Sequence, residues 1–538
     1  MSNRNDGFNG KLKALLPYLL IAVVGVSAYF LTKLAIPEPT SITRAETGVP
    51  VRSSYPEREE VVVKNKKTER GKSGALDFSA IDNGAIPNQR IVVFKDKAAL
   101  DAFLAKMGDG VSILGRLDRL NALLIGFTNE SDLTALLDGT EETAFNFPAS
   151  LPEFESVGPQ DGAVPLGSDL LRWLGIEGDN SLWGKGFRIA IIDTGIADHL
   201  VFKNAIERIN IIPLPEDLAN QNGHGTGVAT PIFSDHPFAP GVAPAAIPIS
   251  IRAANDDGSS NTFLLIQALE AAINAKADYI NFSLGGQGKS ALFERLIDDA
   301  ISQGIVIVAA AGNTGKEGVL YPGAFRNVIT FGAVDAQSQP MAYSTTGREV
   351  AAAAPGYGVN VAFPNGKAAQ VSGTSFSAPI GIGVMAGIGS NAGSPRMTPR
   401  QSADHFLANL HDIGVQGFDK QSGGGVPNAG TMIYPKQYDA SVNSITISRG
   451  KNGSLAQVMV QNVGTQRLLN SGVTVNVNGV ATSVNITTLA PMESRVVSIP
   501  VSTTESLNIQ GSVQASGGQI DQRPSNNSLS QSISATAP

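Results

Sequence analysis

The sequence of 538 residues predicts an α/β protein with an open, parallel central sheet. Short apolar runs such as 189–192 and 305–308 predict buried strands, and a polar residue follows each run closely. The carboxyl ends of parallel strands meet at one crevice, so we expect these polar residues to converge there. A mixed strand-helix pattern before this region and a strand-rich pattern after it predict two further domains.

A candidate nucleophile follows a Gly-Thr turn. Ser375 stands just before an apolar run of small residues, 376–388, which predicts a buried helix. The first N–H groups of a helix lack intrahelical partners and favour negative charge, so a serine there is placed to attack a substrate. Serine is also a common helix cap without chemistry. A catalytic role therefore requires a base, an orienting carboxylate and an oxyanion donor elsewhere in the chain.

Three further polar residues supply these groups. Asp193 ends a strand-like run, His224 opens a helix-like segment, and Asn313 follows another strand-like run. Imidazole can take the proton of Ser375, because its pKa lies near the operating pH. A buried carboxylate such as Asp193 would fix the tautomer of His224. The amide of Asn313 and the N–H of Ser375 would stabilise an oxyanion.

The segments around these residues resemble the signature blocks of the subtilisin-like serine proteases. The blocks are Asp193-Thr194-Gly195, His224-Gly225-Thr226 and Gly373-Thr374-Ser375, in the chain order of that family. Further segments are similar to family motifs: 241–244, 280–286, 321–323, 354–356 and 423–429. The resemblance covers 166–435. It implies a subtilisin-like parallel sheet flanked by helices and a serine endopeptidase that forms an acyl-enzyme.

The resemblance also implies where peptide substrates bind. Residues 280–286 are similar to the strand whose edge lines the primary specificity pocket. The substrate-binding residues implied are Ser283, Leu284, Gly285 and Gly286. The two glycines would let an extended peptide approach the backbone closely. Gly227 replaces a usual histidine and Phe376 a usual methionine, so the preferred substrate side chain is left open.

The remaining histidines have weaker claims to a catalytic role. Asp198 and His199 are adjacent and could imitate a catalytic pair, but charged pairs in loops are usually solvated. His405 follows a capping box with proline at the first helical position, 398–401. We therefore expect His405 and His411 at the surface or at a helix end.

The composition limits cofactors and partners. Cysteine is absent, which excludes disulfides and cysteine metal sites. No cofactor is predicted. Calcium is often bound in the family, but no acidic loop can be assigned to it. The formal net charge of −7 argues against a nucleic-acid partner. The predicted partners are protein or peptide substrates, the chain's own propeptide, and a membrane.

The N-terminal region predicts export. Residues 14–32 carry no charge and are long enough to span a bilayer core. The basic residues within 1–13 predict a cytoplasmic N-terminus. Two interpretations stay open: a retained signal anchor, or a signal peptide cleaved near 26–28. The protein would then be membrane-anchored outside the cytoplasm, or secreted.

A small domain is predicted between this region and the peptidase domain. Residues 33–86 are polar and predict a flexible stalk. Residues 87–147 predict strand, helix, strand, strand, helix, strand, which is the ferredoxin-like order. The expected strands are 90–94, 111–117, 120–127 and 143–147, and the helices begin at Asp96 and at Asn129 or Ser131. This unit resembles the family's propeptide, which implies an inhibitor and folding template. The linker 148–165 could be cut, releasing the enzyme or leaving it associated, or could stay intact.

The C-terminal region predicts a small β-sandwich. Residues 440–538 alternate between polar and apolar positions, with strands at 455–460, 473–477 and 495–501 and an Asn-Gly turn at 478–479. The end of the region is expected to be mobile. Substrate capture, envelope attachment and stabilisation stay open as its role, with stabilisation favoured. The alternative to an enzyme is an inactive subtilase-fold scaffold protein that binds through this β module.

Overall fold

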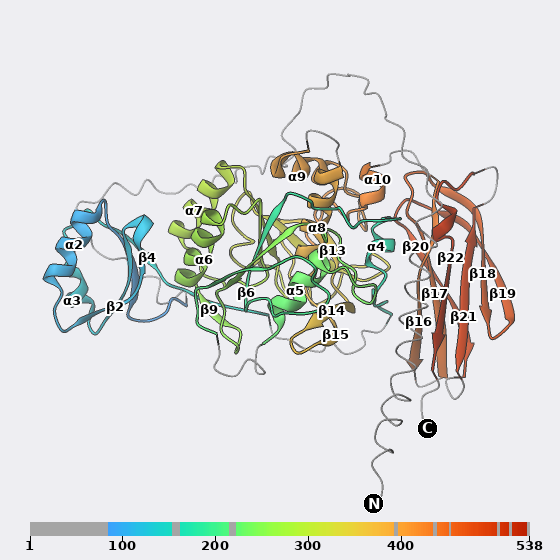
Figure 1. Cartoon of the computed structure of the whole chain (residues 1–538), viewed down its shortest axis with the longest axis horizontal. Coiled ribbons are helices and arrows are strands. Elements are labelled where there is room, and N and C mark those ends of the chain that lie inside the picture. The colour runs from blue at the N-terminus through green and yellow to red at the C-terminus, as the bar shows by residue number, and fades with distance from the viewer. Residues whose placement is uncertain are drawn as a thin grey trace, which may run out of the picture. The chain divides into compact units, whose positions relative to one another are not determined.

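The computed structural model describes residues 84–152, 162–214, 222–391, 396–433, 438–450, 453–502, 506–515 and 519–534 (Figure 1). They all belong to one compact unit, residues 53–538. The predicted segments 1–13 and 14–32 and nearly all of the predicted stalk lie outside the described residues. Within the described residues, no helix is both long enough and apolar enough to cross a membrane.

A seven-stranded sheet forms the centre of residues 166–435, the predicted peptidase domain, and confirms the predicted α/β class. Its order is β13-β12-β11-β10-β6-β8-β7, and all neighbouring strands are parallel. The strands are β6 (Arg188–Asp193), β7 (Glu207–Asn210), β8 (Ile247–Arg252), β10 (Tyr279–Phe282), β11 (Val306–Ala310), β12 (Ile329–Val334) and β13 (Val350–Pro355). A hairpin of β14 (Val359–Phe363) and β15 (Lys367–Val371) lies outside this sheet.

Helices cover both faces of the sheet (Figure 1). In β6, Ile189 and Ile191 belong to one core cluster, whereas Ala190 and Ile192 belong to another. The first cluster includes side chains of α5 (His224–Phe233), α8 (Thr374–Asn391) and α9 (Pro399–Ala408), and the second those of α6 (Thr262–Asn274) and α7 (Ala291–Ser302). Two buried faces explain why the strands are continuous apolar runs. The short helices are α4 (Leu170–Trp173) and α10 (Ala429–Ile433).

The predicted helix 376–388 is confirmed as the interior of α8. Every residue from Thr374 to Gly389 is buried. Small residues are required because neighbours approach closely: a Cβ on Gly381 would lie 2.0 Å from the ring of Phe331. The helix begins at the carboxyl-end side of the sheet, next to the strand ends that carry the other predicted site residues.

The N-terminal unit has the predicted order of elements. It contains β1 (Gln89–Val93), α2 (Lys97–Lys106), β2 (Val111–Leu117), β3 (Ala122–Phe127), α3 (Glu130–Thr134) and β4 (Glu142–Phe145), in an antiparallel sheet ordered β2-β3-β1-β4. The predicted strand 120–127 begins two residues late, because 118–120 form a 3₁₀ turn and Asn121 has a positive φ of 48°.

The N-terminal unit packs on the peptidase domain through its sheet. Leu123 and Ile125 of β3 pack against α2 and α3 of the N-terminal unit. Ala122 and Leu124, in contrast, join the core cluster of α6 and α7. A Cβ on Gly115 would lie 2.4 Å from the ring of Phe263 in α6, so glycine allows this close approach. The unit therefore covers the helical face of the peptidase domain opposite to α8.

The predicted linker 148–165 needs a correction at its start. Its first residues form strand β5 (Pro148–Ser150), which pairs with β9 (Ser259–Asn261) of the peptidase domain. The predicted strand 143–147 correspondingly ends at Phe145, because Asn146 and Phe147 bond to α6 instead. A three-residue strand has no measurable periodicity, so its pattern could not reveal it.

Two antiparallel sheets form the C-terminal module. Their orders are β16-β17-β20 and β19-β18-β21-β22, and side chains of both build one core. The strands are β16 (Ala440–Gly450), β17 (Gly453–Asn462), β18 (Leu468–Val477), β19 (Val480–Leu489), β20 (Ser494–Val501), β21 (Leu507–Gln514) and β22 (Ser528–Ile533). Asn478 and Gly479 have positive φ values of 49° and 91° in the predicted hairpin turn.

A buried polar network joins the module to the peptidase domain. The guanidinium of Arg523 pairs with Asp439 and donates to the carbonyl of Gly175, which belongs to the peptidase domain. Asn526 donates to Asp439 at 2.8 Å, and its carbonyl accepts a bond of 2.6 Å from Arg172. The buried polar groups of the module thus find some of their hydrogen-bond partners in the peptidase domain.

This network predicts stability that depends on pH. Burial raises the pKa of Asp439 to about 7, although Arg523 counteracts part of the effect. The unfolded carboxyl has a pKa of about 3.9, so the folded chain keeps a proton that the unfolded chain loses. The contribution of Asp439 to stability therefore falls as pH rises from about 4 to about 7.

We expect Arg523→Ala to destabilise the chain by about 2 kcal/mol at pH 8 and by less at pH 5. At pH 8 the buried carboxylate of Asp439 would have lost its cation, whereas at pH 5 it can stay neutral. Thermal unfolding at both pH values measures this. Arg523→Lys retains the charge and should recover part of the loss. Equal melting temperatures for Arg523→Ala and the parent at pH 8 would contradict the network's role.

Candidate active site

Asp193 and His224 form the central pair of the site. Asp193 is the last residue of β6 and His224 the first of α5, and both are almost fully buried. The Nδ1 atom of His224 lies 2.8 Å from each carboxylate oxygen of Asp193. Nδ1–H therefore donates to the carboxylate, which leaves Nε2 as the atom that can exchange a proton with a substrate.

Local residues fix the start of helix α5. The N–H of His224 donates to the side chain of Asn222 at 3.1 Å, which satisfies a free donor at the helix N-terminus. A Cβ on Gly225 would lie 2.4 Å from the carbonyl oxygen of Gly195, so only glycine allows the helix to approach the end of β6 this closely. The second signature block thus requires glycine after its histidine.

Ser375 lies in the first turn of α8 and is 1% exposed. Its hydroxyl donates to the carbonyl oxygen of Ser283 at 3.3 Å, and the hydroxyl of Ser283 donates to the carbonyl of Ser375 at 2.9 Å. The ring of His224 lies beside the following residue, Phe376, with 5.9 Å between ring centroids. The start of α8 therefore brings the serine block and the histidine block together.

Asn313 reaches the same helix start from the loop after β11. Its carbonyl oxygen accepts from the N–H of Thr374 at 3.0 Å and from the hydroxyl of Thr374 at 2.9 Å. The side-chain NH₂ lies on the other side of the amide, 2.9 Å from where a Cβ on Gly373 would stand. Gly373 has a φ of +149°, which favours glycine, and its missing side chain keeps space open beside the amide.

The structure assigns positioning roles that sequence reasoning missed. Thr374 orients the amide of Asn313 and accepts from the N–H of Gly312 at 3.2 Å. Thr194 donates its N–H to Asp193 at 2.8 Å and accepts from the N–H of Gly225 at 3.1 Å. Both threonines lie inside the signature blocks, so their position in the motif was the available signal.

The two departures from the family pattern are neighbours in space. A Cβ on Gly227 would lie 3.4 Å from the ring of Phe376, which is 1% exposed. The large ring of Phe376 therefore packs over the position where Gly227 has no side chain, behind the imidazole of His224. Both departures therefore lie in the buried core beside His224.

The predicted substrate-binding strand carries a bound segment of the chain itself. Ser150 exchanges two backbone hydrogen bonds with Gly285, of 3.0 and 3.1 Å. On the other side, the N–H of Leu151 donates to the carbonyl of Gly258 at 2.9 Å. Residues 146–152, here called the groove segment, thus lie between β9 and the segment after β10 that contains Gly285.

The four residues predicted to bind substrate have different surroundings. Ser283 contacts Ser375, and Gly285 pairs with the groove segment. The position of a Cβ on Gly286 is 2.3 Å from the carbonyl oxygen of Pro148, so glycine is needed for this approach. Leu284 is buried, with 4% of its surface exposed.

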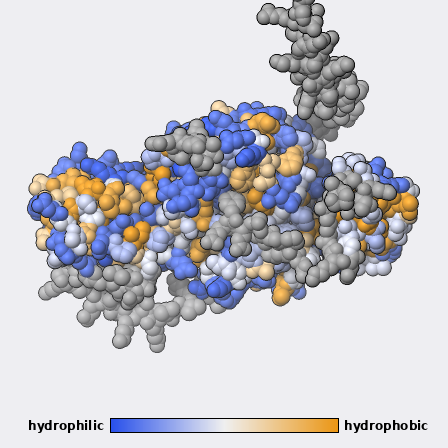
Figure 2. All heavy atoms as spheres, turned by 90° about the horizontal axis from the view of Figure 1, so that it is seen from below, coloured by the Kyte–Doolittle hydropathy of each residue, from blue (hydrophilic) through white to orange (hydrophobic). Residues whose placement is uncertain are grey.

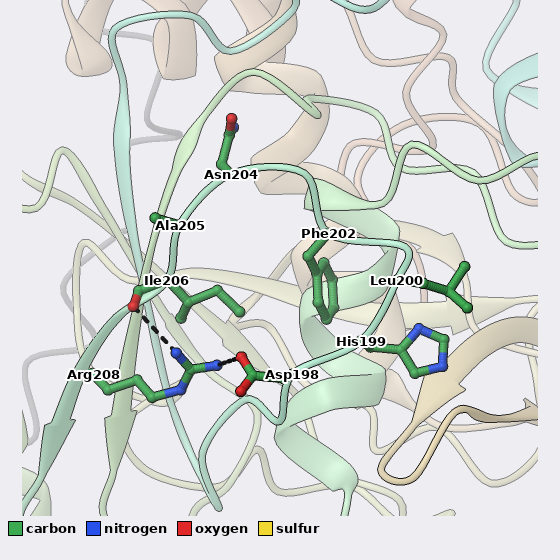
Figure 3. Close-up of a pocket in the computed structure, with 8 residues that line it drawn as sticks. All are labelled: Asp198, His199, Leu200, Phe202, Asn204, Ala205, Ile206 and Arg208. Carbon is green, nitrogen blue, oxygen red and sulfur yellow. Dashed lines mark hydrogen bonds and ion pairs between the residues drawn. The ribbon is translucent and has the colours of Figure 1, made fainter.

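The pocket in Figure 3 lies in the loop after Asp193 and lacks the predicted catalytic residues. It has a volume of about 560 Å³ and contains Asp198, His199 and Arg208. Asp198 points to Arg208, with which it forms an ion pair of 2.6 Å, whereas His199 points away from both (Figure 3). The side chain of Asp198 is 96% exposed. The two adjacent residues therefore have separate surroundings, and a catalytic dyad is not formed here.

Two further histidines, His405 and His411, lie beside α9 and α10. His405 is in the last turn of α9, and its Nε2 lies 3.1 Å from the carbonyl of Met432. His411 follows that helix, and burial lowers its pKa to about 4. Its Nε2 lies 2.8 Å from the hydroxyl of Thr431. His405 is thus at the predicted helix end, while His411 is more buried than a surface position implies.

The described residues offer no acidic cluster to which the calcium often bound in the family could be assigned. Among them, no group of three or more histidine, aspartate or glutamate side chains gathers. Asp235 and Asp198, on either side of the pocket loop, pair with Lys203 and Arg208 instead. On the face in Figure 2, apolar side chains gather over the N-terminal unit at the left end and lie scattered among hydrophilic ones elsewhere.

Comparison with known proteins identifies the family. The model of the subtilase family matches residues 184–425. The thermostable alkaline protease of Halalkalibacterium halodurans is 36% identical over 39% of this chain and 58% of its own length. The minor extracellular protease Epr of Bacillus subtilis is 32% identical over 49% of this chain and 41% of its length.

A further relative is covered over most of its length. Subtilisin DY of Bacillus licheniformis is 32% identical over 40% of this chain and 81% of its own length. The matches thus span about half the length of the first two relatives but most of subtilisin DY. The residues that the family model matches contain the whole parallel sheet and the candidate site described above. The chain belongs to the subtilase family of serine proteases.

Proposed function

We propose that the protein is an exported serine endopeptidase, made as a precursor that its own N-terminal unit inhibits. The single observation that carries the proposal is the contact of His224 with both oxygens of Asp193 beside the helix start that holds Ser375. This geometry orients one imidazole nitrogen toward the carboxylate and leaves the other for proton transfer. An inactive scaffold would not need this arrangement.

Each residue has a defined role in the proposed reaction. The Oγ of Ser375 attacks the peptide carbonyl carbon while Nε2 of His224 takes the hydroxyl proton. Asp193 stabilises the imidazolium, and the NH₂ of Asn313 with the N–H of Ser375 holds the oxyanion. The C–N bond then breaks, and the proton passes from His224 to the leaving amine. Water, deprotonated by His224, hydrolyses the acyl-enzyme and releases the acid.

Two contacts support an inhibitory role for residues 87–147. Their sheet packs on α6, where the side-chain oxygen of Asn146 accepts from the N–H of Phe263 at 3.1 Å. The groove segment then pairs with Gly285 and β9, where an extended substrate would bind. A covalently attached strand has a high effective concentration, so it excludes other peptides from the groove.

The proposed location rests on the N-terminal sequence and one relative. Residues 14–32 predict a signal anchor or a signal peptide, and the relative Epr is named as extracellular. Proteins and extended peptides are the proposed substrates, because a groove between two strands binds main chain rather than one side chain. The C-terminal module would stabilise the peptidase domain through Arg523 and its partners.

The proposal is tested by comparing the chain with Ser375→Ala. We expect the parent to cut itself and then to hydrolyse an unfolded protein such as casein, whereas Ser375→Ala should do neither. Electrophoresis and N-terminal sequencing follow both reactions. If the parent hydrolyses nothing even after limited proteolysis has removed its N-terminal unit, the endopeptidase proposal fails.

A further inference from the structure

The groove segment is bound in a register that identifies the residue nearest to Ser375. Ser150 and Gly285 form an antiparallel bridge, so residue 152 stands opposite residue 283. Ser283 is the residue whose carbonyl accepts from the hydroxyl of Ser375 and whose hydroxyl bonds back to the carbonyl of Ser375. Continued by two residues, this register would place the carbonyl group of Pro152 next to the proposed nucleophile.

Alternation along the segment fixes the direction of each backbone N–H. The N–H and carbonyl of Ser150 point to Gly285, whereas the N–H of Leu151 points to Gly258 on the opposite side. In an extended strand the next N–H returns to the first side. Residue 152 would therefore donate to the carbonyl of Ser283 if it had an N–H.

Residue 152 is proline and cannot make this bond. The carbonyl oxygen of Ser283 instead accepts from the hydroxyl of Ser375 at 3.3 Å. A substrate with an ordinary residue at this position would supply an N–H for that carbonyl and compete with the hydroxyl for it. Proline also fixes its φ near −65°, which departs from the extended conformation of a bound strand.

We propose that Pro152 makes the groove segment a slow substrate, and so keeps residues 87–147 bound as an inhibitor. This inference rests on the proposed function. Without a hydrogen bond to Ser283, the carbonyl carbon of Pro152 is held loosely against Ser375. The hydroxyl of Ser375 is also partly engaged by the carbonyl oxygen of Ser283, which an ordinary substrate would occupy with its own N–H. Hydrolysis of the bond after Pro152 is therefore slow, and it limits the rate at which the precursor is converted to the active enzyme.

The chemical step is hydrolysis of the peptide bond that follows Pro152. Ser375 Oγ bonds to the carbonyl carbon of Pro152, the C–N bond to residue 153 breaks, and the amine takes the proton that His224 received from Ser375. Water then splits the ester, giving a carboxylate on Pro152 and restoring Ser375. Pro152 belongs to the bound substrate and not to the catalytic machinery, so it acts as a determinant of specificity.

The test compares the full chain with Pro152→Ala and with Pro87→Ala. Both substitutions exchange a proline for an alanine within the N-terminal region, but Pro87 is exposed and lies outside the groove segment. We expect the Pro152→Ala precursor to cut itself about threefold to tenfold faster than the parent, which is the range that one regained hydrogen bond provides. Pro87→Ala should convert at the parental rate. Product mass identifies whether the new C-terminus is residue 152.

Hydrolysis of an added extended peptide, measured in the same samples, separates the possible failures. If all three forms come to hydrolyse the peptide but Pro152→Ala converts no faster than the parent, the role of Pro152 is wrong and the endopeptidase proposal stands. Faster conversion that cuts at a bond other than the one after residue 152 also contradicts this inference. If no form cuts itself or the peptide, the proposed function itself fails.

Discussion

Replacing Ser375 with alanine is expected to lower the turnover of a peptide substrate by about 10⁶-fold. Removing the hydroxyl removes the atom that attacks the carbonyl, while the 1% exposure of Ser375 limits the change to a small cavity in the first turn of α8. The pair of Asp193 and His224 does not depend on this hydroxyl. Steady-state rates on an extended peptide, with a matched thermal melt, measure the effect.

The double variant Ser375→Ala with His224→Ala provides the control. Groups that act as one unit give losses that do not add, so the second substitution should cost almost nothing after the first. A further large loss in the double variant would show that His224 acts separately from Ser375. A single variant Ser375→Ala that keeps most of its activity would exclude the serine as nucleophile.

Replacing Asn313 with alanine is expected to lower turnover by about 10²–10³-fold with little change in KM. The side-chain NH₂ of Asn313 is held in place because Oδ1 of the same amide accepts from the hydroxyl of Thr374 at 2.9 Å and from its N–H at 3.0 Å. A donor fixed before the reaction stabilises the charge that develops on the carbonyl oxygen, and it contributes little to the uncharged substrate. The effect should therefore appear in kcat alone.

Thr374→Val separates orientation from donation. It removes the hydroxyl that donates to Asn313 but retains the backbone N–H that also bonds to it, so we expect a smaller loss in kcat than for Asn313→Ala. Equal kcat values for Asn313→Ala and the parent would remove Asn313 from the oxyanion role. An increase in KM without a fall in kcat would assign Asn313 to substrate binding instead.

The candidate site could be proposed from the sequence because its signals are local. Each of Asp193, His224 and Ser375 stands at a boundary between a regular element and a turn, and the neighbouring glycines are required there by backbone contacts. Gly225, for example, has the carbonyl of Gly195 where its side chain would be. The parallel sheet then brings these boundaries to one edge.

Contacts between distant segments could not be predicted in the same way. Strand β5 has three residues, and its pairing with β9 joins positions more than 100 residues apart. The partnership of Arg523 with Asp439 likewise has no pattern along the chain. The fit of Phe376 over Gly227 is visible only in three dimensions, although each departure was apparent from the sequence.

The central claim is that Ser375 is a nucleophile activated by His224. A fluorophosphonate reagent forms a covalent bond only with an activated serine, and peptide mass spectrometry locates the adduct. After the N-terminal unit has been removed by limited proteolysis, we expect one phosphonate per chain, on Ser375, and a strongly reduced yield in His224→Ala. No adduct, or an adduct on the neighbouring Ser377 that is unchanged in His224→Ala, would contradict the claim.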